Sequence, residues 1–223
     1  MGLNKSTGNM YDFITHTWNT VKGACSHDCS YCYMKRWGKL NPVRFDEKEL
    51  KTDLGEGNLI FVGSSCDMWA KDIPDNWIRK TLHHMEKFDN KYLLQTKNPN
   101  NILNYIDATV ISDKSVICST IETNRWMPEI MKNSPSPIER VESLILISEC
   151  IDTYITIEPI MDFDLSEMVK LISWCNPKQV NIGADSGKHN LPEPSKEKLL
   201  ALIDELQKFT TIARKTNLTR LIK

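Results

Sequence analysis

The chain has 223 residues, and its 28 lysines and arginines against 29 aspartates and glutamates give a formal net charge of −1. A hydrophobic fraction of 40% and a charged fraction of 26% are typical of a globular domain. The balanced charge excludes a global basic field for nucleic acid, and no apolar run is long enough for a membrane span or a signal peptide. We expect one cytoplasmic domain over residues 1–223, with no membrane partner.

Short apolar runs alternate with amphipathic stretches along the chain. The runs are rich in β-branched residues and end in polar residues or glycine, which predicts buried parallel strands. The predicted strands cover residues 11–18 (weakly), 59–63, 91–96, 116–121, 154–159 and 179–184. The predicted helices cover residues 46–54, 74–88, 137–150, 164–174 and 195–209, with Pro74 and Ser195 at two of the starts. Residues 133–138 are predicted to form a surface loop. The C-terminal helix and the basic tail that follows it together span residues 195–223.

Repeated strand–helix units predict a parallel sheet with right-handed crossovers. About six units fit the chain, so we expect an α/β fold in the form of an open, partial (β/α)6 TIM-like barrel. In such sheets the functional residues lie at the carboxyl ends of the strands. Candidate functional residues are therefore sought at the carboxyl ends of the predicted strands.

Three of the seven cysteines stand together in 25-CSHDCSYC-32. Their C-x3-C-x2-C spacing places three soft thiolate ligands, Cys25, Cys29 and Cys32, on one loop, which suits an iron–sulfur cluster. A cluster of four irons on three thiolates leaves one iron open to a small molecule. The alternative is a zinc site with His27 or His16 as the fourth ligand. Structural zinc sites usually bring two separated pairs of ligands, and the sequence has no second pair.

The other four cysteines are scattered and form no second metal motif. We expect Cys118, Cys150 and Cys175 to be core residues. Cys66 follows a predicted strand, where a small buried residue is the plainer interpretation. Cations follow the cysteine loop at Lys35, Arg36, Lys39 and Arg44, and they form either a local basic patch or a solvated face.

The cysteine spacing, with the aromatic Tyr31 before the last cysteine and strand–helix repeats after it, resembles the radical S-adenosylmethionine (SAM) superfamily. The resemblance extends to 60-IFVGSSCDMWAKDIPDNWI-78, 94-LQTKNP-99, 157-IEP-159 and 182-IGADSG-187. These segments look like a short, phage-associated branch that is similar in layout to spore photoproduct lyase. Cys66 stands where serine is more typical of that branch, and Ala184 and Asp185 stand where Gly-Glu is typical.

The resemblance implies a [4Fe–4S] cluster on the three cysteines, SAM at the open iron, and an external one-electron reductant of the flavodoxin or ferredoxin type. It implies that cleavage of SAM gives a 5′-deoxyadenosyl radical, which abstracts hydrogen from a substrate. The substrate suggested by this layout is a small molecule such as a nucleoside or nucleotide, or a nucleic-acid base. Two other interpretations stay open: a zinc-stabilised nucleic-acid-binding module and a catalytically silent iron–sulfur protein.

The resemblance and the strand-end rule together assign the remaining candidates. The catalytic candidates are Cys66, as a hydrogen-atom donor, and Glu158. The candidates for SAM binding are Tyr31, Gly63, Ser64, Ser65, Lys97, Ser119, Glu122 and Asp185. Plainer roles compete with these: a cap at Ser65 or Asp67, a solvated Lys97, a salt bridge from Glu158 to a lysine or arginine of the barrel, and a turn at Asp185. Strand alternation leaves open whether Ser119 or Thr120 points inward.

Overall fold

The computed structural model describes residues 3–7 and 11–223, so five residues of the predicted domain, 1–2 and 8–10, lie outside the described part. Eight described strands form one sheet in the order β1-β2-β5-β6-β7-β8-β9-β10. All neighbours in it are parallel except β1 and β2, which pair antiparallel at one edge. The strands are β1 (Asn4–Lys5), β2 (His16–Trp18), β5 (Leu59–Val62), β6 (Lys91–Thr96), β7 (Ser115–Thr120), β8 (Thr153–Ile157), β9 (Gln179–Ile182) and β10 (Thr211–Arg214), with β3 (Val21–Lys22) and β4 (Arg44–Phe45) in a separate pair.

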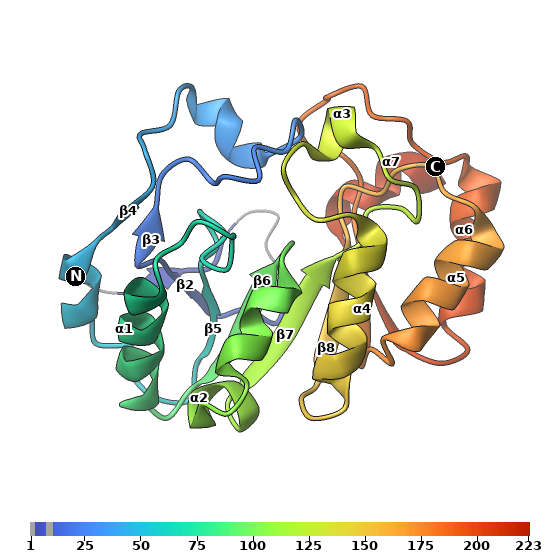
Figure 1. The fold of residues 1–223 in the computed structure, drawn as a ribbon. Helices are drawn as coiled ribbons and strands as arrows, with labels where there is room; N and C mark the ends of the chain where they lie inside the picture. The colour runs from blue at the N-terminus through green and yellow to red at the C-terminus, as the bar shows by residue number, and fades with distance from the viewer. Residues whose placement is uncertain (1–2, 8–10) are drawn as a thin grey trace.

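Helices follow most of the parallel strands and cover one face of the sheet (Figure 1). The α-helices are α1 (Asp75–Glu86), α2 (Thr109–Ser112), α3 (Pro128–Met131), α4 (Pro137–Ser148), α5 (Leu165–Trp174), α6 (Lys196–Leu206) and α7 (Thr219–Ile222). The 3-10 helices are η1 (Tyr33–Trp37), η2 (Glu47–Lys51), η3 (Pro99–Tyr105) and η4 (Thr216–Leu218). The predicted α/β fold with an open, mostly parallel sheet is confirmed.

The two faces of the sheet carry different side chains because neighbouring residues of a strand point to opposite faces. Ile60 and Val62 of β5 belong to the large core that the helices cover. Phe61 of the same strand joins a smaller cluster with Leu93 and Cys118 on the other face. Tyr11 and Ile14 lie in that smaller cluster, so the segment before β2 covers part of this second face.

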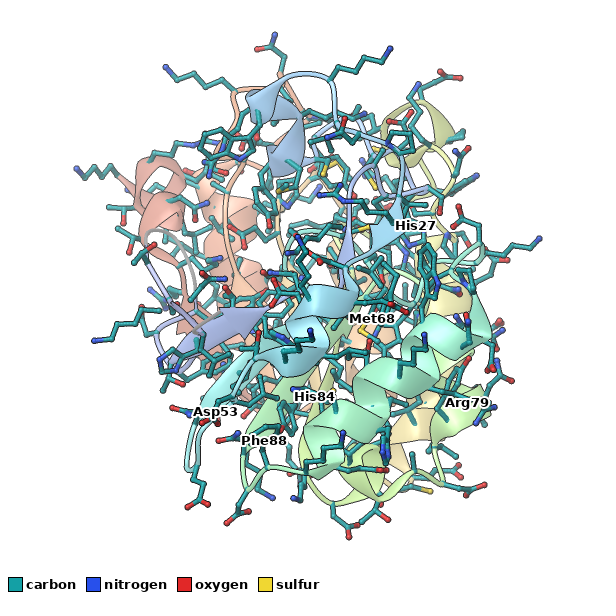
Figure 2. The ribbon with its side chains drawn as sticks, turned by 90° about the vertical axis from the view of Figure 1, so that its left-hand side faces the viewer. His27, Asp53, Met68, Arg79, His84 and Phe88 are labelled. Atoms are coloured by element: carbon teal, nitrogen blue, oxygen red, sulfur yellow. The ribbon has the colours of Figure 1, made fainter. Side chains whose placement is uncertain are left out.

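Local signals explain where the helices begin. Ser136 and Glu139 form a capping box at the start of α4, and the Ser195 hydroxyl accepts a hydrogen bond from the Lys198 amide at the start of α6. On α1, Arg79 and His84 leave the helix on different sides (Figure 2). Arg79 is exposed, and His84 is buried with its Nε2 at 2.8 Å from the Thr52 carbonyl oxygen.

Several predicted elements differ from the structure. The predicted tail contains an additional parallel strand, β10, which pairs with β9, so the sheet has seven parallel strands in the described part instead of six. Residues 46–54 contain the short 3-10 helix η2 instead of a longer helix. The 133–138 segment is not a simple surface loop, because Ser134 is buried and accepts a hydrogen bond from Arg140. Cys118 and Cys175 are buried as expected, but Cys150 is exposed.

Candidate functional site

A cavity of about 720 Å³ opens at the carboxyl ends of the parallel strands, and the three clustered cysteines line it. In Figure 1 the strand arrows point toward this end, where the loops after the strands gather. Turns that follow several of the strands contribute to its wall, as the strand-end rule predicts. The predicted residues that line the cavity are Cys25, Cys29, Tyr31, Cys32, Gly63, Ser64, Ser65, Cys66, Lys97, Glu158 and Asp185.

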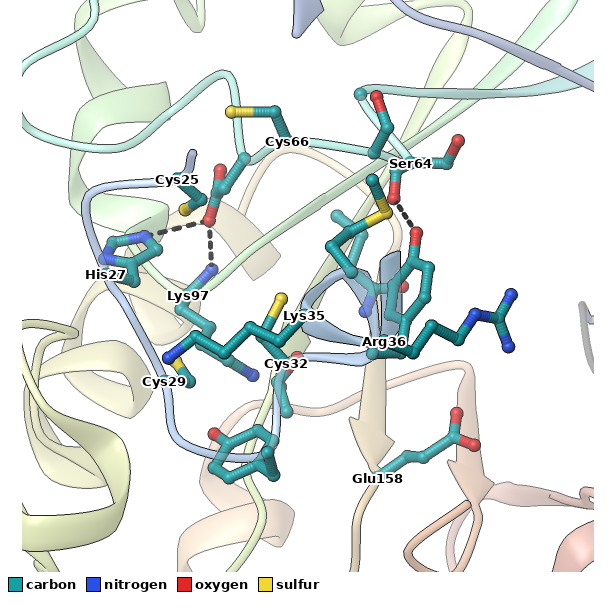
Figure 3. Close-up of a pocket in the computed structure, with 18 of the residues that line it drawn as sticks. Cys25, His27, Cys29, Cys32, Lys35, Arg36, Ser64, Cys66, Lys97 and Glu158 are labelled. Carbon is teal, nitrogen blue, oxygen red and sulfur yellow. Dashed lines mark hydrogen bonds and ion pairs between the residues drawn. The ribbon is translucent and has the colours of Figure 1, made fainter. Parts of the chain in front are cut away.

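The cysteine loop is a series of tight turns between β3 and η1. The Asp28 amide donates to the Cys25 carbonyl and the Cys32 amide to the Cys29 carbonyl, both at 3.2 Å. Asp28 itself has a φ of 50°, a conformation that aspartate tolerates better than most residues. Figure 3 shows the three thiols along one side of the cavity. Cys29 is buried, whereas Cys25 and Cys32 are half-buried.

Asp67 ties the cysteine loop to the sheet. Its carboxylate is 3.0 Å from His27 Nε2 and accepts hydrogen bonds from the Thr96 hydroxyl and the Lys97 amide, each at 2.9 Å (Figure 3). The Trp69 amide also donates to it, at 3.0 Å, which is the capping role considered from the sequence. Burial would raise the pKa of Asp67, but the contact with His27 outweighs it and lowers the pKa. Asp67 is therefore an ionised anchor, a role that the sequence did not reveal.

Glu122 lies beneath the cavity and is fully buried. Its carboxylate accepts a hydrogen bond from Lys97 Nζ at 2.8 Å, one from Arg140 at 2.7 Å, and one from the Tyr31 hydroxyl. Burial would raise the pKa of Glu122, but Arg140 and Lys97 outweigh it and hold the pKa at about 2. Two cations on one carboxylate leave a net positive charge beneath this side of the cavity. Glu122 does not line the cavity itself, but its hydrogen bonds orient Lys97 and Tyr31, which do.

The turn after β5 brings backbone close to the cysteines. Gly63 has a φ of 80°, a conformation that favours glycine. The Asn19 side chain accepts hydrogen bonds from the Ser64 hydroxyl, at 3.2 Å, and from the Ser65 amide, at 2.9 Å. The Ser64 carbonyl accepts a hydrogen bond from Tyr33, which joins this turn to η1 (Figure 3). The turn is thus held both from β2 and from η1.

Cys66 is buried at the edge of the cavity beside Cys25. A hydrogen bond between the two thiols, together with burial, raises the pKa of Cys25. Burial also raises the pKa of Cys29. Both shifts favour the thiol over the thiolate at these two positions.

The other side of the cavity carries an ion pair. Lys215 Nζ donates to Glu158 at 2.7 Å, and the Asn217 amide donates to the same carboxylate at 3.1 Å. Lys215 also lies over the ring of Tyr11, 4.5 Å from its centroid. A Cβ on Gly183 would approach the Glu158 carboxylate to 2.7 Å, so a glycine is required where the Glu158 side chain passes. The salt bridge to a lysine that was the alternative role for Glu158 is present, and both of its side chains are half-buried.

Two further candidates have specific surroundings. Asp185 lines the cavity, but its carboxylate accepts a hydrogen bond from the Gly187 amide at 2.9 Å and contacts His189 Nδ1 at 2.7 Å, as the turn interpretation requires. Ser119 does not line the cavity: its hydroxyl donates to the Thr96 carbonyl at 2.8 Å, and Thr120 faces the cavity instead. The assignment of Ser119 to SAM therefore has no geometric support.

The sequence missed several residues of the site. Lys215 follows β10 as Lys97 follows β6, so the strand-end rule would have found it had β10 been recognised. Tyr11 and Gln95 also line the cavity, and the Tyr11 hydroxyl donates to Gln95 at 2.8 Å. Arg140 carried no signal, because a single arginine in an amphipathic helix normally faces solvent.

The residues present fit an iron–sulfur cluster. The cysteine loop brings three thiols to the cavity, and sulfur ligands are those that such clusters take. Lys97 and the 63–65 turn border the same space, where a second small molecule has room beside them. Among the described residues, no helix is of the length and apolar character needed to cross a membrane.

Comparisons with known proteins identify a family and a partial relative. A family model described as "Protein of unknown function (DUF5131)" matches residues 9–196. The ribosomal protein uS12 methylthiotransferase RimO of Lawsonia intracellularis (strain PHE/MN1-00) is 32% identical over 73 residues, which are 30% of this chain. The chain spans only 17% of that relative's length.

Solved structures share the fold at low sequence identity. A spore photoproduct lyase variant is 12% identical, with a TM-score of 0.67, over 94% of this chain and 78% of its own. Another variant, with bound AdoMet and dinucleoside spore photoproduct, has a TM-score of 0.60 at 12% identity, over 93% of this chain and 66% of its own. Streptococcus suis SuiB bound to S-adenosylmethionine has a TM-score of 0.54 at 10% identity, over 89% of this chain and 49% of its own. These structures share the open, mostly parallel α/β fold that was expected from the strand–helix pattern.

Proposed function

This chain belongs to the family described as "Protein of unknown function (DUF5131)", and we propose that it is a radical SAM enzyme. The observation that carries the proposal is the position of Cys25, Cys29 and Cys32. They line a cavity at the carboxyl ends of a parallel sheet, in a fold shared with proteins solved with bound SAM. The predicted spacing and the observed geometry thus support the same chemistry.

In this proposal, Cys25, Cys29 and Cys32 hold a [4Fe–4S] cluster. When bound and reduced by an external one-electron donor of the flavodoxin or ferredoxin type, such a cluster supplies the electron that cleaves SAM to methionine and a 5′-deoxyadenosyl radical. The chain's own part is to hold the ligands, orient SAM and exclude water. Asp67 serves the first purpose, because its bonds to His27 and to the end of β6 fix the loop that bears the cysteines.

The SAM site is proposed beside the cysteines. Lys97 presents an ammonium group over the Tyr31 ring, 5.2 Å from its centroid, and suits the SAM carboxylate as a point charge. Gly63, Ser64 and Ser65 offer backbone groups to the methionine moiety, with Asp185 available to the rest of SAM. Glu122 contributes by holding Lys97 and Tyr31 in place.

The substrate is proposed to be a nucleoside, a nucleotide or a nucleic-acid base, held on the side of Glu158. Its carboxylate is partly exposed to the cavity, with 18% of the side chain accessible. Cys66 is the proposed hydrogen-atom donor to a product radical, since its thiol borders the same cavity. One of the solved neighbours, spore photoproduct lyase, holds a dinucleoside photoproduct, which supports this substrate class.

The test is anaerobic reconstitution of the full chain with iron and sulfide, reduction with dithionite, and measurement of 5′-deoxyadenosine formed from SAM. We expect iron and sulfide in a ratio of about four each per chain, and product that disappears in Cys29→Ala. Cys150→Ala is the matched control, because Cys150 is exposed and lies outside the cavity lining. A full cluster without product would favour a silent iron–sulfur protein. Stoichiometric zinc without iron would favour the zinc-stabilised module and contradict the proposal.

A further inference from the structure

We propose that the segment Tyr33–Lys39, termed here the rim segment, is a docking surface for single-stranded nucleic acid. This inference rests on the proposed function, because it names the partner that would bring a base into the cavity. It needs three properties of the segment: exposed rings on which bases stack, cations for phosphates, and continuity with the cavity. Each of them is present in the described structure.

The rim segment exposes two large aromatic side chains. Trp37 is 69% exposed and Tyr33 is 44% exposed. Trp37 therefore leaves most of its ring in water, although a tryptophan gains more from burial than most residues. Base stacking on aromatic side chains is a main source of affinity for single strands that lack a fixed sequence. Two exposed rings four residues apart are suited to this role.

Arg36 joins the two rings into one surface. Its guanidinium carbon is 4.9 Å from the centroid of the Trp37 ring and 5.7 Å from that of Tyr33. Stacking uses the flat face of the guanidinium and leaves its N–H groups at the edge for phosphate oxygens. Arg36 points away from the three cysteines (Figure 3) and is exposed. A strand lying there would meet a stacking surface and a phosphate ligand together.

The local charge is positive although the whole chain is nearly neutral. Residues 33–44 contain Lys35, Arg36, Lys39 and Arg44 and no acidic residue. Lys35 is engaged by the Asp28 carboxylate at 2.6 Å, whereas Arg36 and Lys39 extend into solvent. Two or three cations suffice for a few phosphates of a single strand, but not for the many phosphates of a long duplex.

The rim segment is part of the cavity wall. Tyr33, Arg36 and Lys39 line the same cavity as Cys29 and Cys32. η1 begins directly after Cys32, and the hydrogen bond from Tyr33 to the Ser64 carbonyl fixes its position relative to the turn after β5. A base inserted into the cavity would therefore leave its neighbours in the strand over Arg36 and Trp37.

An acidic reductant protein is the other partner that a basic rim could attract. An acidic protein would need only the positive charge of the rim segment, because its encounter with a basic surface depends on complementary electrostatic potential. The alternation of rings with cations, and the stacking of Arg36 on both rings, favour the nucleic acid. Binding of flavodoxin is therefore measured separately from binding of the oligomers.

Binding is measured by fluorescence anisotropy with the full chain and labelled oligomers of about twelve nucleotides, a length within the range that single-strand sites occupy. Separate arms use a deoxyribo-oligomer, a ribo-oligomer, an abasic oligomer and a duplex. We expect one or both single strands to bind more tightly than the abasic oligomer and the duplex. Trp37→Ala should weaken this binding by roughly 5- to 150-fold, the range measured when one stacking aromatic is removed.

Trp174→Ala is the matched control. Trp174 is 47% exposed and lies under a lysine, with Lys170 Nζ 5.0 Å from its ring centroid. It is on α5, no residue of which lines the cavity, whereas both neighbours of Trp37, Arg36 and Gly38, line it. We expect its binding to stay within about twofold of the unchanged chain, as for a surface substitution away from the site. The double variant Arg36→Ala, Lys39→Ala should make the slope of log affinity against log salt shallower by about 1.4, or about 0.7 for each phosphate that the variant no longer neutralises.

Three results would overturn the proposal: no binding of any single strand, equal binding of the abasic oligomer, or equal losses in Trp37→Ala and Trp174→Ala. Flavodoxin binding that weakens in Arg36→Ala, Lys39→Ala while no oligomer binds would assign the rim segment to the reductant instead. SAM cleavage without added oligomer is measured in parallel on the same preparations. Cleavage with no oligomer binding contradicts only this inference, whereas binding with no cleavage by a full cluster contradicts the proposed function.

Discussion

Two groups of the same three residue types lie at the cavity, each with its lysine and tyrosine in the lining, and they differ in their surroundings. On the cysteine side, Lys97 lies over the ring of Tyr31 and bonds to Glu122 at 2.8 Å. On the other side, Lys215 lies over the ring of Tyr11 and bonds to Glu158 at 2.7 Å. We call them the Lys97 group and the Lys215 group.

The difference lies in the carboxylates. Glu122 is fully buried and bonded to a second cation, Arg140, whereas Glu158 is partly exposed and has the neutral amide of Asn217 as its second donor. Among the described residues, Glu122 thus bonds to two cations, Lys97 and Arg140, which leaves an excess of positive charge beside it. An excess positive charge suits the carboxylate of SAM, and a partly exposed carboxylate suits a substrate that must enter and leave.

The strongest test of this difference is Arg140→Met. It leaves Glu122 buried with one cation fewer, and the loss of one partner of a buried ion pair costs about 3–5 kcal/mol of unfolding free energy. Arg125→Met is the control, since Arg125 bonds to Asp162 and Asp164 at 2.6 Å but is 38% exposed. That change should cost less than about 1 kcal/mol. Urea unfolding measures both, and equal losses would contradict the contrast.

The Lys97 group should also make stability depend on pH. Burial would raise the pKa of Glu122, but Arg140 and Lys97 hold it at about 2, below the usual value of about 4.3 for an unfolded chain. A lowered pKa in the folded state stabilises the protein above the unfolded pKa, and this stability is lost as the pH falls. We expect a loss of about 3 kcal/mol from this group between roughly pH 5 and pH 2. When unfolding is measured at several pH values, the free energy of unfolding should fall less between roughly pH 5 and pH 2 in Glu122→Gln than in Glu158→Gln. The first variant lacks the Glu122 carboxylate, whereas the second keeps it.

A smaller effect is expected from Gly183→Ala on the Lys215 side. The new Cβ would meet the Glu158 carboxylate at 2.7 Å, so the side chain must shift from Lys215, at a cost of about 1–3 kcal/mol. In a Glu158→Ala background the same substitution should cost much less, because the atoms it meets are gone. A double-mutant cycle from urea unfolding checks this, and additive losses would show that the carboxylate is not the obstacle.

The smallest expected effect separates the two lysines by ligand. Lys97→Met should weaken SAM binding about tenfold, or about 1.4 kcal/mol, because it removes the charge proposed for the SAM carboxylate. Lys215→Met should leave SAM affinity within about twofold. Equilibrium dialysis of SAM with the reconstituted protein measures both. If Lys215→Met weakened SAM binding more than Lys97→Met, the assignment of the two sides would be reversed.

The sequence predicted one side of the cavity better than the other. The cysteine spacing is a local signal, and the strongly apolar runs of β5, β6 and β8 made their carboxyl ends easy to find. Gly63, Lys97 and Glu158, which follow these strands, line the cavity. β10 escaped recognition because it is a short edge strand that is exposed or half-buried throughout, so its residues lack a hydrophobic pattern. Lys215 was therefore assigned to a basic tail.

Other errors arose where tertiary contacts decide the outcome. The choice between Ser119 and Thr120 depends on which face of β7 turns to the cavity, and alternation alone gives two equivalent answers. Arg140 lies within α4, where the helical pattern predicts a solvent-facing cation, but the fold buries it completely against Glu122. The facing of β7 and the bond between Arg140 and Glu122 both depend on residues that are distant in sequence. The sequence of one chain therefore carries no pattern that predicts them.

The contacts of Asp67 bear on how tightly the cysteine loop can hold metal. Through its carboxylate, Asp67 joins His27 to the segment after β5 and to the end of β6. None of these four contacts involves a thiol. Where a metal site must order its own loop, part of the binding free energy is consumed in restricting the chain. Here these bonds already order the part of the loop around His27, so the proposed cluster would lose less of its binding free energy to ordering the loop.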